Sequence, residues 1–244
     1  MKNYSIFFSY DGTNFWGSQK QKDRRTVQGE IEKALSKSTG AEILTTLAGR
    51  TDRGVHAIKQ CANFFSKTLI PTPSLKNMLK NFLPGDIFVK DLIEVPINFN
   101  ARRDALSRSY VYRMKLEKNI SVFERNYFCP LDHALDLDAF KKIISPVVGL
   151  HDFSSFTKGA ELKKNKKIEI IDYSATLKGD FYEISLEARS FLRGMVRIVI
   201  GSALAEYFGA RKKGYFYRKL QNADPSAEKI LAPPEGLYLR DIKY

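Results

Sequence analysis

Apolar positions follow two different periods along the chain, and the order of these periods predicts the fold. Runs rich in aromatic and β-branched residues predict strands at 3–10, 42–48, 57–65 and 87–95. Two intervening segments repeat apolar residues every three or four positions and predict helices over 26–40 and 73–83. Thr26 is the expected N-cap of the first helix, and Gly40 is its expected C-terminal stop. The resulting order, β-α-β-β-α-β, is typical of ferredoxin-like folds.

The rest of the chain repeats that order with insertions. Strands are predicted at 106–116, 167–177, 181–188 and 236–244, and helices at 138–148, 190–209 and 215–223. We therefore predict an α/β (α+β) protein of two ferredoxin-like βαββαβ halves, one over 1–98 and the other over 99–244. Many RNA-binding domains share this order, but so do proteins of unrelated function.

The charge balance narrows the range of partners. Lys and Arg number 40 against 27 for Asp and Glu, which gives a net charge of +13 and a pI near 9.6. The excess is spread along the chain and not confined to a tail, so the pattern favours a basic folded surface for a polyanion. Cys61 and Cys129 lie far apart without a CxxC or Cys/His cluster, which favours neither disulfides nor zinc and fits a reducing cytoplasm. We expect no export signal and no membrane span.

Few side chains have the spacing of a cofactor site. His56, His133 and His151 are isolated from one another, and neither a P-loop nor a GxGxxG motif opens a helix. We therefore expect no metal and no nucleotide cofactor. Among the reactive side chains, Asp52 is the strongest candidate for a site, because Arg50 and Arg53 flank it in the short loop "GRTDRG". Nearby cations favour its ionised form, which would suit a nucleophile or base, although an Asx turn or local ion pair is the favoured interpretation from local sequence alone.

Two further candidate site residues lie in the second half of the chain. Arg197 interrupts a nearly continuous apolar helix, where a guanidinium needs a carboxylate partner, and Asp52, Glu187 and Glu206 are the candidates. Arg189, Arg193 and Arg197 recur at a spacing of four and are expected on one side of that helix. Tyr110 lies on one face of the strand at 106–116, where it would serve equally as a core residue or as a stacking partner for a flipped base.

Several segments in order carry a family resemblance over nearly the whole chain. They are "YDGTNFWGSQKQ" with "TVQGEIEKAL", "AGRTDRGVHA", "NFLPGDI", "FNARRDALSRSYVYR", "HDFSSF", "FLRGMVRIVIG" and "EGLYL". Together they resemble the tRNA pseudouridine synthase A family. The resemblance implies that Asp52 is the essential catalytic aspartate and that Arg50 handles the tRNA near the target base. It also implies that Tyr110 packs beside that base and that Arg197 pairs with the aspartate.

The same resemblance implies a function and an assembly. The function is isomerisation of uridine to pseudouridine at positions 38, 39 and 40 of the tRNA anticodon stem-loop, without a cofactor. The assembly is a cytoplasmic homodimer with an extended mixed, mostly antiparallel sheet, helices on one side and a basic cleft. Arg53 and Ser18 depart from the family pattern, and Lys163 and Lys164 keep the charge of a segment that differs from it. The alternatives are a non-catalytic tRNA- or RNA-binding protein of the same fold and, more distantly, a nucleoside hydrolase or nuclease using Asp52.

Overall fold

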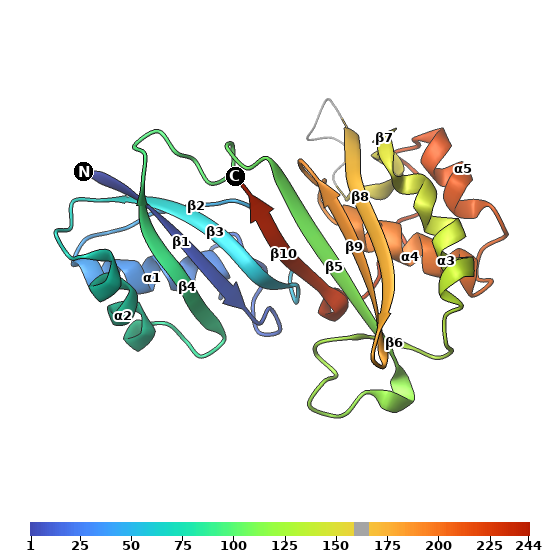
Figure 1. The fold of residues 1–244 in the computed structure, drawn as a ribbon, viewed down its shortest axis with the longest axis horizontal. Coiled ribbons are helices and arrows are strands. Elements are labelled where there is room, and N and C mark those ends of the chain that lie inside the picture. The colour runs from blue at the N-terminus through green and yellow to red at the C-terminus, as the bar shows by residue number, and fades with distance from the viewer. Residues whose placement is uncertain (159–165) are drawn as a thin grey trace. The chain divides into compact units, whose positions relative to one another are not determined.

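The structure is a computed structural model in which residues 1–158 and 166–244 are described (Figure 1). The chain divides into two compact units. The first contains residues 1–108 and 238–244, and the second contains residues 109–237.

The first unit is a sheet of five strands with two helices. Its elements are β1 (Lys2–Tyr10), α1 (Val27–Thr39), β2 (Thr45–Leu47), β3 (His56–Ser66), α2 (Thr72–Phe82), β4 (Ile87–Val95) and β10 (Leu237–Lys243). The strand order is β4-β1-β3-β10, with β2 also paired to β3. β1 is antiparallel to both β3 and β4, whereas β10 is parallel to β3, with Tyr238 opposite His56. The sheet is therefore mixed and mostly antiparallel.

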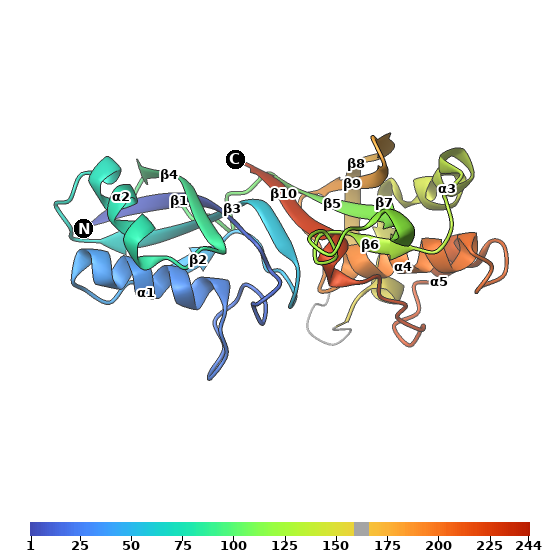
Figure 2. The ribbon, with the colours of Figure 1, turned by 90° about the horizontal axis from the view of Figure 1, so that it is seen from below.

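Residues at the two ends of α1 explain where this helix begins and ends. The Thr26 side chain accepts the Gly29 N–H at 3.3 Å, and Gly40 takes a left-handed φ of 71°, which confirms both predicted ends of α1. Figure 2 shows α1 running along the sheet, and α1 packs against α2. Along β4, Val89 is buried while Phe88 is exposed, so one face of this strand is covered and the other is open.

The second unit joins a curved sheet to a cluster of helices. Its elements are β5 (Ser107–Leu116), β6 (Cys129–Leu131), α3 (Leu137–Ile144), β7 (Gly149–Asp152), β8 (Lys167–Lys178), β9 (Phe181–Ala188), α4 (Met195–Tyr207) and α5 (Tyr215–Asn222). The order is β5-β9-β8-β7, with β6 parallel to β5. α4 contacts both α3 and α5. The core is aromatic and aliphatic, and its fully buried members include Phe140, Phe153, Phe156, Ile198 and Phe216.

The predicted mixed, mostly antiparallel α/β class is confirmed, but three details differ from the sequence prediction. β10 pairs in parallel with β3, a pairing that the sequence pattern did not predict, and residues 238–244 belong to the same compact unit as residues 1–108. α4 begins at Met195 and not at residue 190, because Gly194 takes a left-handed φ of 69°. The short strands β6 and β7 were not predicted. Among the described residues, no helix is both long and apolar enough to cross a membrane.

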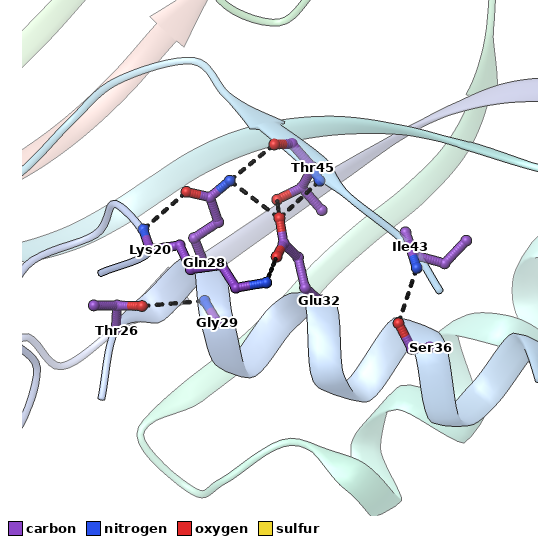
Figure 3. A network of polar contacts seen from close by, with 8 residues as sticks. All are labelled: Lys20, Thr26, Gln28, Gly29, Glu32, Ser36, Ile43 and Thr45. Atoms are coloured by element: carbon purple, nitrogen blue, oxygen red, sulfur yellow. Dashed lines mark hydrogen bonds and ion pairs between the residues drawn. The ribbon is translucent and has the colours of Figure 1, made fainter. Parts of the chain in front are cut away.

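A buried carboxylate ties α1 to the strand that leads into the Asp52 loop (Figure 3). Glu32 is 5% exposed, and its Oε1 accepts the Thr45 backbone N–H at 2.9 Å and the Gln28 amide at 3.1 Å. Its Oε2 accepts the Lys20 ammonium at 2.9 Å, and this bond is the main reason that the pKa of Lys20 is raised. The Gln28 amide also donates to the Thr45 carbonyl oxygen at 2.9 Å. The start of β2 is therefore fixed to α1 by side-chain bonds.

Replacement of Glu32 tests this link. Glu32→Ala leaves the Thr45 N–H without its acceptor, so we expect the free energy of unfolding to fall by about 1–3 kcal/mol. Lys33→Ala, at an exposed position of the same helix, should change it by less than about 0.5 kcal/mol. Urea denaturation of both variants measures the difference, and equal stability of the two would contradict the role assigned to Glu32.

Candidate active site

Asp52 lies in the hairpin connection between β2 and β3. The two strands are antiparallel, with Leu47 opposite Ala62, so residues 48–55 form the connecting loop. Asp52 is half-buried, whereas Arg50 and Arg53 are exposed. The Val55 N–H donates to the Asp52 carbonyl oxygen at 3.2 Å, and Gly54 supplies a φ of 78° that most residues avoid. A closed turn therefore presents the aspartate between two arginines.

A buried serine of the preceding loop holds the residue before Asp52. The Ser18 N–H donates to the Thr51 carbonyl oxygen at 3.1 Å, and the Thr51 N–H donates to Ser18 Oγ at 2.8 Å. Thr51 Oγ1 also lies 2.8 Å from the hydroxyl of Tyr10. Burial raises the pKa of Tyr10 to about 12, so its hydroxyl stays protonated at neutral pH. Thr51 is therefore fixed through its N–H, its carbonyl and its side chain.

The loop at 11–26 and the Asp52 loop are in backbone contact at two glycines. A Cβ added to Gly12 would lie 2.1 Å from the Val55 carbonyl oxygen, and one added to Gly17 would lie 2.8 Å from the Thr51 carbonyl oxygen. The Gly12 N–H donates to Nδ1 of His56 at 3.0 Å, and the His56 ring stacks on Tyr238 with centroids 4.7 Å apart. His56 therefore supports the loop from β3 as a buried structural residue.

Arg108 and the segment of Arg102 lie next to the same loop, which itself carries Arg50. Arg108 is buried, and its Nε and Nη2 donate to the Ala48 carbonyl oxygen at 3.0 and 2.9 Å. Nη2 also donates to the Arg102 carbonyl oxygen at 2.6 Å, which holds that segment against the loop. Desolvation, followed by the positive charge of Arg102, lowers the pKa of Arg50. An exposed guanidinium close to a like charge is favoured to bind an anion.

The second unit contains the other two predicted site residues. Tyr110, on β5, is 7% exposed, and its ring contacts Phe191 edge to face at a centroid distance of 5.0 Å. Arg197, on α4, is half-buried, and its Nε donates to the Ala232 carbonyl oxygen at 2.7 Å. The predicted pairing of Arg197 with Asp52 concerns residues of different units and stays a prediction.

The structure contradicts one expectation about the helix that carries Arg197, and it shows other partners for one of the carboxylates proposed to pair with Arg197. Arg189 and Arg193 precede α4, so the three arginines do not share one helix side. Among the carboxylates considered as partners of Arg197, Glu206 accepts hydrogen bonds from the N terminus of α5. Its two oxygens accept the N–H groups of Gly214 and Phe216, each at 2.7 Å.

Sequence reasoning missed several supports of the loop. Ser18 was noted only as a departure from the family pattern, although its spacing from Thr51 carries no periodic signal that could have paired them. Arg53 had no assigned role, yet its guanidinium carbon lies 4.0 Å from the centroid of the Trp16 ring.

Lys163 and Lys164 lie outside the described residues. Within the described residues, no group of three or more His, Cys, Asp or Glu side chains is arranged to hold a metal ion.

The site has one carboxylate on a fixed loop, and two exposed arginines flank it in the chain. A carboxylate in this setting is able to act as a base or as a nucleophile, and the arginines are able to hold an anionic substrate. The arrangement fits chemistry on a polyanion.

Comparison with known proteins identifies the family. The family model for tRNA pseudouridine synthase matches residues 6–103 and 143–244. The chain belongs to this family. Two relatives, each called tRNA pseudouridine synthase A, come from Caldicellulosiruptor bescii (36% identical) and Thermoanaerobacter sp. strain X514 (38% identical), and both alignments cover 100% of each chain. A third, from Thermosipho melanesiensis, is 40% identical with the same coverage. The family is one of isomerases.

The matches cover the predicted site residues unequally. Arg50, Asp52 and Arg197 fall inside the segments that the family model matches, whereas Tyr110 lies between them. Among solved structures, a chain of an archaeal box H/ACA sRNP Nop10–Cbf5 complex aligns with 84% of this chain and 43% of its own. Its TM-score of 0.34 and identity of 9% are too low to support an argument.

The backbone contact at Gly12 is testable. Gly12→Ala places a methyl group against the Val55 carbonyl oxygen, so the two loops must separate, and we expect a loss of about 1–3 kcal/mol in stability. The amides of residues 48–56 should also exchange hydrogen faster. Gly85→Ala is the matched control, because a Cβ there meets nothing within 4 Å. Unchanged exchange in the Asp52 loop of Gly12→Ala would show that the two loops are not coupled.

Proposed function

We propose that the protein converts uridine to pseudouridine in the anticodon stem-loop of tRNA, at positions 38, 39 and 40, with Asp52 as the reacting group. The observation that carries the proposal is the fixed Asp52 loop, in a chain whose full-length relatives are called tRNA pseudouridine synthase A. The net charge of +13 suits a tRNA substrate. Homodimeric assembly, which the family resemblance implies, and a cytoplasmic location, which the isolated cysteines favour, belong to the same proposal.

The reaction rearranges bonds within one nucleotide. The N1–C1′ glycosidic bond breaks, the uracil turns, C5 bonds to C1′, and the C5 proton is released while N1 gains a proton. Substrate and product are isomers, so no electrons enter or leave. Asp52 has three competent routes: attack on C1′, attack on C6, or removal of the C2′ proton to give a glycal.

The other site residues have supporting roles in this proposal. The target uridine must leave its stack, which costs a few kcal/mol, and contacts to the base and phosphates offset that cost. Tyr110 packs beside the uracil, Arg50 holds the RNA next to Asp52, and Arg197 pairs with the Asp52 carboxylate. Tyr110 sits against Phe191 with little exposed surface, which favours a fixed ring position for that contact.

Removal of the Asp52 charge tests the chemistry. We expect Asp52→Asn to lower the rate of tritium release from 5-tritiated uridine in tRNA by about 100-fold or more, with tRNA affinity changed only a few-fold. Asp91→Asn, at an exposed aspartate of β4, is the matched control and should retain wild-type turnover. If Asp52→Asn keeps its turnover, Asp52 is not the reacting group. If neither the wild type nor the variant releases tritium while both bind tRNA, the chain is a non-catalytic RNA-binding protein.

Arg197 provides a second test through the reaction rate. If its guanidinium contacts the Asp52 carboxylate during the reaction, Arg197→Met should lower the rate of tritium release by about tenfold or more. Arg197→Lys retains the charge and should keep more of the activity. Wild-type turnover in Arg197→Met, with a melting temperature that shows a folded protein, would remove Arg197 from this role.

A further inference from the structure

Two arginines stack on an exposed tryptophan beside the Asp52 loop. The guanidinium carbons of Arg24 and Arg53 lie 3.9 and 4.0 Å from the centroid of the Trp16 ring. Trp16 is 38% exposed, and both arginines are exposed. Because both carbons lie within 4.0 Å of one point, two positive charges are held no more than about 8 Å apart.

The Trp16 backbone is tied to neighbouring segments. Its N–H donates to the Arg25 carbonyl oxygen at 2.9 Å, and its own carbonyl accepts the Gln21 side-chain amide at 2.9 Å. Two residues later, Ser18 makes its two bonds to Thr51, and Arg53 directly follows Asp52 in the chain. The stack therefore has a fixed place next to the candidate reacting group.

Arg24 differs from its neighbour in the partners it has. Arg25 forms a two-pronged ion pair with Asp86, at 2.7 and 2.8 Å, so its charge is neutralised within the protein. In contrast, neither Arg24 nor Arg53 forms a salt bridge with any residue in 1–158 or 166–244. Two like charges held close together without a carboxylate are stabilised by an external anion, and their N–H groups remain able to donate to one.

We propose that Arg24, Trp16 and Arg53 form a phosphate-binding site for the backbone of the tRNA substrate, next to the nucleotide that reaches Asp52. Trp16 orders the two guanidiniums by stacking, and the guanidiniums donate to phosphate oxygens. The proposal rests on the proposed function in naming tRNA as the polyanion and Asp52 as the group that the target nucleotide reaches.

Trp16 also supplies a direct probe, because it is the only tryptophan in the chain. With excitation selective for tryptophan, a titration with tRNA should change the fluorescence saturably, and the Kd should equal that from filter binding. No change at saturating tRNA would overturn the proposal. A change with poly-glutamate but not with tRNA would also overturn it, in favour of an acidic protein partner.

Variants separate this site from the chemistry. Arg24→Ala with Arg53→Ala should weaken tRNA binding about tenfold or more, raise KM more than it lowers kcat, and reduce the slope of log K against log salt by about 1–2. Lys80→Ala, an exposed lysine of α2, is the control for loss of charge. An unchanged slope in the double variant overturns the proposal even if pseudouridine is made. Absence of pseudouridine together with a reduced slope supports this site and counts against the proposed function.

Discussion

The structure around Asp52 depends on the close approach of two loop backbones. Gly12 and Gly17 lie so near Val55 and Thr51 that no side chain fits between them. This contact allows Ser18 to bond both the N–H and the carbonyl of Thr51, the residue before Asp52. A carboxylate in the role proposed for Asp52 must be held in a productive geometry, and here neighbouring backbone supplies that restraint.

Buried polar side chains of the first unit also hold the Asp52 loop in place. The Tyr10 hydroxyl reaches Thr51 from β1, the side chain of Gln60 bonds both the N–H and the carbonyl of Gly49 from β3, and Arg108 bonds the carbonyl of Ala48. At the other end of β2, Glu32 of α1 bonds Thr45. Such groups are costly to leave unpaired, so each bond favours the same loop position. The loop is therefore set by the core of its unit and not by its own residues alone.

Much of the fold could be predicted from the sequence, because its signals are local. The periodicity of α1, its Thr26 cap and its Gly40 stop all lie within one segment. The position of β10 could not be predicted, since a strand pattern does not reveal that Tyr238 pairs with His56. The start of α4 was missed because the apolar run continues upstream through Leu192, while the backbone of Gly194 sets the boundary.

The candidate site likewise has residues that the sequence could indicate and residues that it could not. Asp52 could be named as a candidate from its glycine- and arginine-bearing loop together with the family segments around it, and its role stays a prediction. Arg53 was not interpretable, because its partner Trp16 lies in a different loop and no spacing rule joins the two. The same applies to the Ser18–Thr51 pair. Long-range contacts between irregular segments leave no periodic trace in one sequence.

The decisive measurement is pseudouridine mapping of tRNA from a strain that lacks this gene. We expect pseudouridine at positions 38, 39 and 40 to disappear from the tRNAs that carry it, and to return when the gene is restored. Pseudouridine that persists at all three positions in the deletion strain would show that this protein does not make it.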